Sequence, residues 1–208
     1  MARDGASRSR RTKEAIFAAA DYLFLQHGYS GTSMDAVAEQ AGVTKQTVYA
    51  HVGDKETLFL DVVDTMTSGA GDVLGDSLIP LTGDTNVERY LEEFAARQLE
   101  IVMTPRLMKL RRMVIGEHVR FPALGAMLHR RGPGRSIARL AEVVDHFVEK
   151  GELRAADPSI AASFFNWLVM GGPTNDAMLL GDRSFLDAAA RRTHSRESVR
   201  IFMAAYGS

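Results

Sequence analysis

The sequence contains no cysteine, which excludes disulfides and thiolate chemistry and fits a reducing compartment. It also lacks any uninterrupted apolar run near the roughly 20 residues that a membrane span requires. The first residues, "MARDGASRSRRTK", are basic but have no apolar segment of the kind found in secretory signals. We therefore expect an intracellular protein with no membrane partner.

A charge bias is missing as well. The chain has 25 Lys and Arg against 26 Asp and Glu, a formal net charge of -1 and a pI near 6.6. Nucleic-acid binding would therefore have to come from a local patch. The apolar content of 46% over 208 residues is enough for a packed core in one large domain or two small ones.

Period-two alternation of β-branched residues is absent, whereas helical spacing of apolar residues runs through most of the chain. Ile16, Ala20, Leu23 and Phe24 are one example. The pattern predicts an all-α protein of roughly nine helices. Helices are short before about residue 52 and long and apolar after it, so we predict a small domain over residues 1–55 and a larger one over 56–208.

Two stretches have the spacing of capping boxes, in which a Thr at a helix start pairs with an acid three residues on. One is Thr32 with Asp35, and the other is Thr85 with Glu88. We expect a helix to begin at each.

Residues 33–52 have the pattern of two short helices joined by a tight turn. "SMDAVAEQ" (33–40) presents Met34 and Val37 on one face, and Gly42 can take the left-handed conformation that ends a helix. A second helix is expected from Thr44, which is a good N-cap, with Val48 turned inward. This is the pattern of a helix-turn-helix, whose second helix faces outward.

The outward side of that second helix is rich in hydrogen-bonding groups suited to the major groove of DNA. An ordinary helical hairpin with a solvated face is the alternative. Such a face usually mixes both signs of charge, whereas Thr44 to Val52 contains one Lys and no acid. DNA binding is therefore favoured, through Lys45, Gln46, Thr47, Tyr49 and His51.

Residues 12–59 resemble the N-terminal DNA-binding domain of the tetracycline-repressor (TetR) family of bacterial transcription regulators. The resemblance rests on "HGY" (27–29), "TSMDAVA" (32–38), "AGVTKQTVY" (41–49) and "DKETLF" (54–59), all in register. It departs at Gln46, where a small residue is common, and at Val52-Gly53, where Phe and Pro are usual. Gln46 suits adenine, so the first departure should change the preferred base.

The resemblance implies phosphate contacts from Thr32 or Ser33, Tyr49 and Lys55, and base contacts from Thr44 to Thr47. Tyr49 could instead be a packing residue, and His51 is equally suited to backbone contact or packing. Arg8, Arg10, Arg11 and Lys13 could lie along a groove as a basic arm, or could simply be solvated.

The C-terminal part resembles the ligand-binding and dimerisation domain of the AefR-like branch of that family, through "VIGEHVRFPAL" (114–124) and "GELRAADPSIAA" (151–162). Residues 160–170 are apolar almost all round, so a helix there needs cover on both sides, as does an apolar stripe on the last helix. A monomeric core is one solution and a homodimer is the favoured one. The predicted dimer residues are Phe165, Leu168, Val199, Phe202, Met203 and Tyr206.

A small, mostly apolar effector is expected inside this domain, since Met and aromatic side chains suit an adaptable apolar site and a few polar groups would orient the ligand. The alternative is that most of these residues are core. The candidates are Leu99, Met103, Met108, Val114, His118, Phe121, Phe164, Asn166, Trp167 and Met170.

Residues 106–139 hold nine Lys or Arg against one acid, Glu117. This basic segment could attract an anion or lie near DNA. Pairing with acids on neighbouring helices, among them Glu92, Glu93 and Glu142, is the favoured interpretation.

No pattern predicts catalysis, a cofactor or a metal site. The six His residues show no i, i+4 zinc pair, and "GPGRS" (132–136) lacks the third Gly of a dinucleotide loop. The sequence thus predicts a cytoplasmic bacterial regulator rather than an enzyme. We expect a repressor that binds a palindromic operator as a homodimer and is released by its effector.

Overall fold

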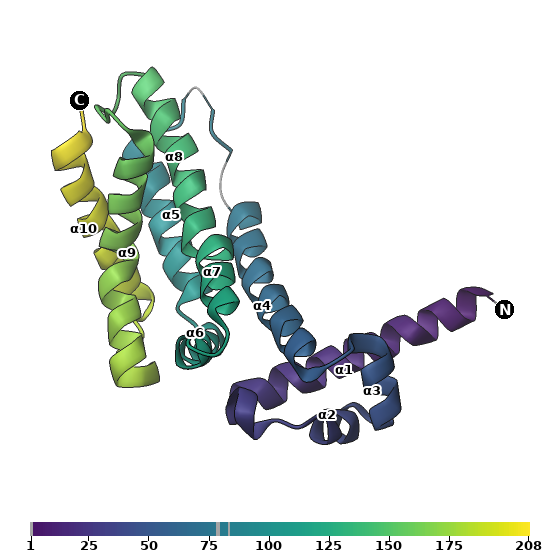
Figure 1. Cartoon of the computed structure of the whole chain (residues 1–208). Helices are drawn as coiled ribbons and strands as arrows, with labels where there is room; N and C mark the ends of the chain where they lie inside the picture. The colour runs from purple at the N-terminus through teal and green to yellow at the C-terminus, as the bar shows by residue number, and fades with distance from the viewer. Residues whose placement is uncertain (1, 78–79, 83) are drawn as a thin grey trace. The chain divides into compact units, whose positions relative to one another are not determined.

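The computed structural model describes residues 2–77, 80–82 and 84–208 (Figure 1). Over these residues the chain forms ten α-helices and one 3-10 helix, so the all-α prediction is confirmed. The first helices are α1 (Ala2–Gly31), α2 (Met34–Ala41), α3 (Lys45–Val52), α4 (Lys55–Ser77) and α5 (Val87–Val102). They are followed by α6 (Pro105–Glu117), α7 (Pro122–Arg131), α8 (Pro133–Glu149), α9 (Pro158–Leu180), the 3-10 helix (Gly181–Ser184) and α10 (Ala188–Tyr206).

The helices gather into two compact units. Unit 1 contains the chain up to Met66 together with Lys109–Met127, and unit 2 contains Thr67–Met108 and Leu128–Ser208. Helix α4 continues without interruption from Lys55 to Ser77. A functional boundary at residue 55 remains a prediction.

Unit 1 is built on α1, which packs against α2, while α2 packs against α3. Its interior is apolar and fully shielded, with Ile16, Val37, Val48 and Phe59 all at 0% exposure. Helix α2 is capped by Ser33, whose hydroxyl accepts from the Ala36 N–H at 3.1 Å. The predicted Thr32 capping box is therefore wrong by one residue.

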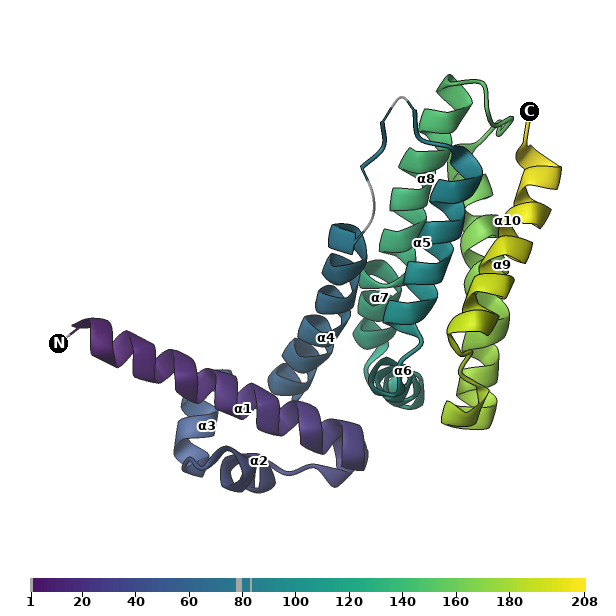
Figure 2. The same ribbon diagram turned by 180° about the vertical axis from the view of Figure 1, so that it is seen from behind.

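Unit 2 contains α5, α8, α9 and α10, which lie side by side as a bundle in both views (Figures 1 and 2). Helix α9 packs against α8, α5 and α10, and α10 also packs against α5. Each helix turns large apolar side chains into a shared core, and burial of such side chains is the main force that holds a bundle together. Core members include Phe94, Leu140, Phe147, Phe165 and Phe202.

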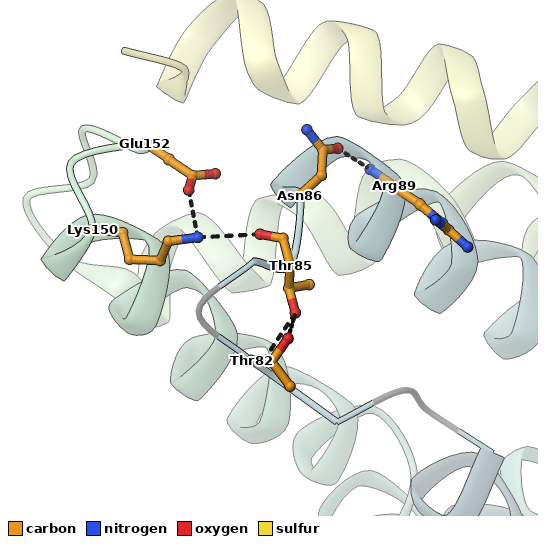
Figure 3. Close-up of polar contacts among 6 residues, drawn as sticks. All are labelled: Thr82, Thr85, Asn86, Arg89, Lys150 and Glu152. Atoms are coloured by element: carbon orange, nitrogen blue, oxygen red, sulfur yellow. Dashed lines mark hydrogen bonds and ion pairs between the residues drawn. The ribbon is translucent and has the colours of Figure 1, made fainter.

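Polar contacts join the start of α5 to the end of α8 (Figure 3). Asn86 caps α5 by accepting from the Arg89 N–H at 2.9 Å, so the predicted Thr85 cap is also wrong by one residue. Thr85 instead accepts from Lys150 Nζ through its carbonyl at 3.2 Å. Lys150 also pairs with Glu152 at 2.6 Å.

A proline lies inside α9 without leaving a buried carbonyl unpaired. Pro173 has no N–H, so it cannot donate to the carbonyl of Val169 four residues earlier. His194 of α10 takes that place, with Nε2 at 2.8 Å from the Val169 oxygen. A carbonyl oxygen can only accept, so Nε2 carries the proton.

Two glycines let arginines of α8 approach the α4 backbone within unit 2. A Cβ at Gly75 would overlap the guanidinium of Arg139, and one at Gly71 would lie 2.9 Å from Arg135 Nη1. Arg139 donates to the Gly71 carbonyl at 2.9 Å, and Arg135 pairs with Asp72 at 2.7 Å. These arginines of the basic segment thus pair with α4 and not with the acids that we expected.

Candidate nucleic-acid interface and effector region

The turn between α2 and α3 has the geometry that the sequence predicted. Gly42 adopts φ 67° and ψ 32°, the left-handed region that favours glycine, and its N–H donates to carbonyls at the end of α2. The Val43 N–H donates to the Ala38 carbonyl at 3.0 Å. Together these bonds satisfy the last carbonyls of α2 and direct the chain into α3.

Helix α3 is anchored on one side and open on the other. Val48 and Val52 are buried, at 0% and 6% exposure. Thr44 caps the helix, since its hydroxyl accepts from the Thr47 N–H at 3.2 Å. Lys45 and Gln46 are exposed, and Tyr49 is 42% exposed. This surface of polar side chains, uninterrupted by buried residues, is referred to below as the α3 surface (Lys45, Gln46 and Tyr49).

An acidic side chain of α2 adjoins the α3 surface, although the residues of α3 itself include no acid. Asp35 forms an ion pair with Lys45 at 2.9 Å, and both side chains are largely exposed. The hydrogen bond to Asp35 raises the pKa of Lys45, which keeps the ammonium charged. A phosphate or base edge that binds Lys45 would have to compete with this carboxylate.

Two cations share one aromatic ring in unit 1. Lys55 Nζ lies 4.2 Å from the centre of the Tyr29 ring, and the Arg120 guanidinium lies 4.7 Å from it. Burial, followed by repulsion from Arg120, lowers the pKa of Lys55. Phe121 packs edge-on against Tyr29 at 4.7 Å and lies 5.9 Å from Phe59. The α6–α7 connection is therefore anchored directly on the N-terminal helices.

The other candidates for DNA contact differ in accessibility. Thr32 is 3% exposed and its hydroxyl donates to the Gly28 carbonyl, so the structure does not present it to a ligand. Ser33 is exposed but uses its hydroxyl as a cap. Arg10 is exposed within α1, 3.7 Å from Glu14, and His51 is half-buried.

The predicted effector residues are divided between the two units. Five of them belong to unit 2 and are buried or half-buried: Leu99, Met103, Met108, Asn166 and Met170. The other three that are not on α9 belong to unit 1. Val114 and Phe121 are buried in its core, and His118 is exposed. Phe164 and Trp167 are 63% and 41% exposed, so they lie on the exposed side of α9 and not in the core of unit 2.

Three of the six predicted dimer residues are buried in the core of unit 2. Phe165, Val199 and Phe202 are at most 2% exposed, and the rings of Phe165 and Phe202 meet at 5.0 Å inside unit 2. Leu168, Met203 and Tyr206 are half-buried. For Phe165 the reason is that α9 is apolar on both faces, so its composition could not show which face turns inward.

Tyr29 and Gln98 were missing from the predicted site residues. Tyr29 belongs to the "HGY" motif, and its ring is the platform for Lys55 and Arg120. Gln98 lies at a core position of α5 and bonds Asn166 of α9 at 2.8 Å. A polar residue at a buried position of the apolar helical pattern was the signal that could have identified Gln98.

Comparison with known families decides the identity of the fold. Residues 16–62 match the family of bacterial regulatory proteins called tetR, and residues 89–208 match the C-terminal domain of AefR-like transcriptional repressors. The chain belongs to the TetR family. It is therefore a DNA-binding transcription regulator with a helix-turn-helix domain, and TetR-family regulators are not enzymes.

Individual relatives support this over most of the chain. A TetR-family regulator from Mesorhizobium loti is 36% identical, with a TM-score of 0.87 over 97% of this chain and 99% of its own. The flavonoid-responsive regulator FrrA is 29% identical, with a TM-score of 0.78 over 95% and 97%. The transcriptional regulator SrpR of Pseudomonas putida is 27% identical over 82% of this chain and 78% of its own.

Within the residues that the structure describes, no group of three or more His, Cys, Asp or Glu could hold a metal ion. None of the helices in the described ranges is long and apolar enough to cross a membrane.

Proposed function

We propose that this TetR-family regulator is a repressor that binds a palindromic operator as a homodimer and leaves it when a small effector binds. The α3 surface carries the proposal, because its exposed donors and acceptors sit on a helix anchored by buried valines. Lys45, Gln46 and Thr47 would approach base edges, while Ser33, Tyr49 and Lys55 would contact phosphates. We propose the bacterial cytoplasm as its location, because a chromosomal operator lies there.

Exposed apolar side chains on the last two long helices support a homodimer. Ile160, Phe164 and Trp167 follow one face of α9 and are 53%, 63% and 41% exposed, and Ile201 of α10 is 42% exposed. A contiguous exposed apolar face usually marks an interface. A two-fold pairing through it would hold two α3 helices for half-sites about 34–36 Å apart. This face replaces the buried residues that we first assigned to the dimer.

The flexible methionine side chains of unit 2 suit a small, mostly apolar effector. Met103, Met108 and Met170 are unbranched and adapt their shape to a ligand, and all three are buried or half-buried. The name of FrrA describes it as flavonoid-responsive. We propose an effector of comparable aromatic and apolar character.

Arg120 and Phe121 offer a route from effector to DNA. They follow α6, which begins at Pro105 in unit 2 and continues into unit 1, and they contact Tyr29, which also contacts Lys55. An effector that favours one position of α6 would thereby shift the helix-turn-helix, provided that it binds the two states with different affinity.

A mobility-shift assay with the DNA flanking the gene tests this proposal. We expect a specific complex whose affinity falls steeply with salt, and a two-fold symmetric footprint. Random DNA of equal length is the control. Equal binding to both DNAs at every salt concentration would rule out the operator model.

A further inference from the structure

Two buried amides in unit 2 form one hydrogen bond, which engages only two of their four polar atoms. Gln98 of α5 is 2% exposed, and Asn166 of α9 is 1% exposed. Gln98 Nε2 donates to Asn166 Oδ1 at 2.8 Å. Gln98 Oε1 and Asn166 Nδ2 have no hydrogen-bond partner among the described residues. Buried polar atoms are nearly always paired, so this exception calls for a missing partner.

The unpaired atoms are complementary to each other. Gln98 is left with an unpaired acceptor and Asn166 with an unpaired donor, and the two side chains are joined by the 2.8 Å hydrogen bond. Exchanging oxygen and nitrogen in both amides exchanges these roles but again leaves one donor beside one acceptor. A partner that satisfies both must therefore carry an acceptor and a donor close together.

The surroundings of the pair are apolar and compressible. One turn further along each helix lie Val102 of α5 and Met170 of α9, and beyond them the Thr174 hydroxyl lies 3.9 Å from the Met103 sulfur. Methionine side chains change shape at little cost. Every buried polar residue in the described part of the chain is uncharged, so this interior favours a neutral ligand over an ionised one.

We propose that the Gln98–Asn166 pair anchors the effector, and that the effector is a neutral, mostly apolar molecule with a hydrogen-bond donor next to an acceptor. The proposal rests on the effector-released regulator proposed above and names the chemistry that its site recognises. Primary and secondary amides and hydroxyl-bearing ketones belong to this class. An ordered water could also satisfy the two atoms, and the experiment separates the two cases.

Three naphthalene probes of matched shape test the proposal on the full chain by calorimetry. 2-Naphthamide carries a donor and an acceptor, 2-acetonaphthone carries an acceptor alone, and 2-naphthoate is ionised. We expect 2-naphthamide to bind about tenfold more tightly than the ketone, because one further hydrogen bond forms. Naphthoate should bind more weakly than the amide.

Variants test whether the Gln98–Asn166 pair causes the preference for the amide over the ketone. In Gln98→Leu/Asn166→Leu the two leucines remove both unpaired atoms, so the preference for the amide over the ketone should disappear while the chain stays folded. Ser198→Ala is the matched control, since Ser198 is buried but its hydroxyl donates to the His194 carbonyl of the same helix. This variant should keep the preference.

Three results would overturn the proposal: equal binding of amide and ketone, preference retained in the double variant, or no probe binding to the wild-type chain. Operator binding is measured on the same samples. A chain that binds its operator but shows any of these results contradicts the ligand proposal alone, whereas loss of specific DNA binding contradicts the proposed function.

Discussion

Gln46 and Lys55 are both hydrogen-bond donors, yet their surroundings suit them to different parts of DNA. Gln46 is the second residue of α3 and is exposed, so its amide can reach a base edge. Lys55 is half-buried at the start of α4, and its ammonium lies on the Tyr29 ring. Because contact with the Tyr29 ring fixes the position of this ammonium, Lys55 suits a contact with one phosphate of the DNA backbone.

Replacing Gln46 by Ala should relax the preference at one base pair of each half-site by about 1–3 kcal/mol. Binding to random DNA should hardly change, because the amide carries no charge. Competition titrations with single-base operator variants measure the effect. An equal loss on operator and random DNA would contradict a base-reading role for Gln46.

Replacing Lys55 by Ala should weaken binding to every DNA sequence alike and reduce the salt slope by about one. Lys55→Arg keeps the charge and serves as the matched control. Because the side chain also packs on Tyr29, melting temperatures of both variants should be compared. An unchanged salt slope in Lys55→Ala would argue against a phosphate contact.

Asp54 should make the stability of the N-terminal helices depend on pH. Its carboxylate accepts from the Thr57 N–H at 2.7 Å, and this bond lowers the pKa of Asp54. A pKa that is lower in the folded chain contributes stability above the unfolded value near 3.9 and loses it as the pH falls through the folded value. Asp54→Ala should therefore melt below the wild type at pH 7 and approach it near pH 3.

Thermal melts across that pH range provide the measurement. Asp61→Ala, which removes an exposed carboxylate from within α4 and not from its start, is the control. A melting difference for Asp54→Ala that stayed constant down to pH 3 would exclude the carboxylate as its cause.

At the scale of elements, the turn between α2 and α3 depends on one backbone conformation. A Cβ at Gly42 would meet no atom within 4 Å, so the cost of Gly42→Ala comes from its φ of 67° alone. We expect a loss of about 1 kcal/mol in the free energy of unfolding. Gly69→Ala lies within α4, also without a neighbour within 4 Å, and should gain about 0.5–1 kcal/mol.

Denaturant titrations of the two alanine variants measure these opposite changes. A loss in both variants would mean that glycine is needed for a reason other than its backbone conformation. A gain in both would show that the left-handed turn adapts to a side chain.

Local signals predicted the helices and the turn well, because caps, glycines and apolar spacing act over a few residues. Thr44 and Gly42 were correctly assigned from such signals. Both predicted capping boxes were displaced by one residue, since Ser33 and Asn86 lie beside equally good candidates. The inward face of α9 could not be predicted, because apolar residues cover both of its faces and tertiary packing alone selects one.

At the scale of the whole molecule, Phe164→Asp should convert the proposed homodimer into a monomer. Phe164 is 63% exposed, so the substitution should leave the fold of the subunit intact while placing charge in an apolar contact. Sedimentation at micromolar concentration checks the result. Val73→Asp, at a site of α4 that is 56% exposed, is the control and should not change the assembly.

A dimer that survives Phe164→Asp would remove this face of α9 from the interface. Deleting the chain from Arg196 onward would not answer the same question. Val199 and Phe202 are 2% exposed in the core of unit 2, so the deletion should unfold the subunit itself.

The hydrogen bond between His194 Nε2 and the Val169 carbonyl, four residues before Pro173, gives the protein an internal spectroscopic probe. Because Nε2 must donate to Val169, the imidazole is held in one tautomer, with Nδ1 free of its proton when the ring is neutral. The ¹⁵N shifts of this ring would report the alignment of α9 with α10. Since Phe164 and Trp167 lie on the same α9, subunit association could be followed from inside one protomer, without a label at the interface.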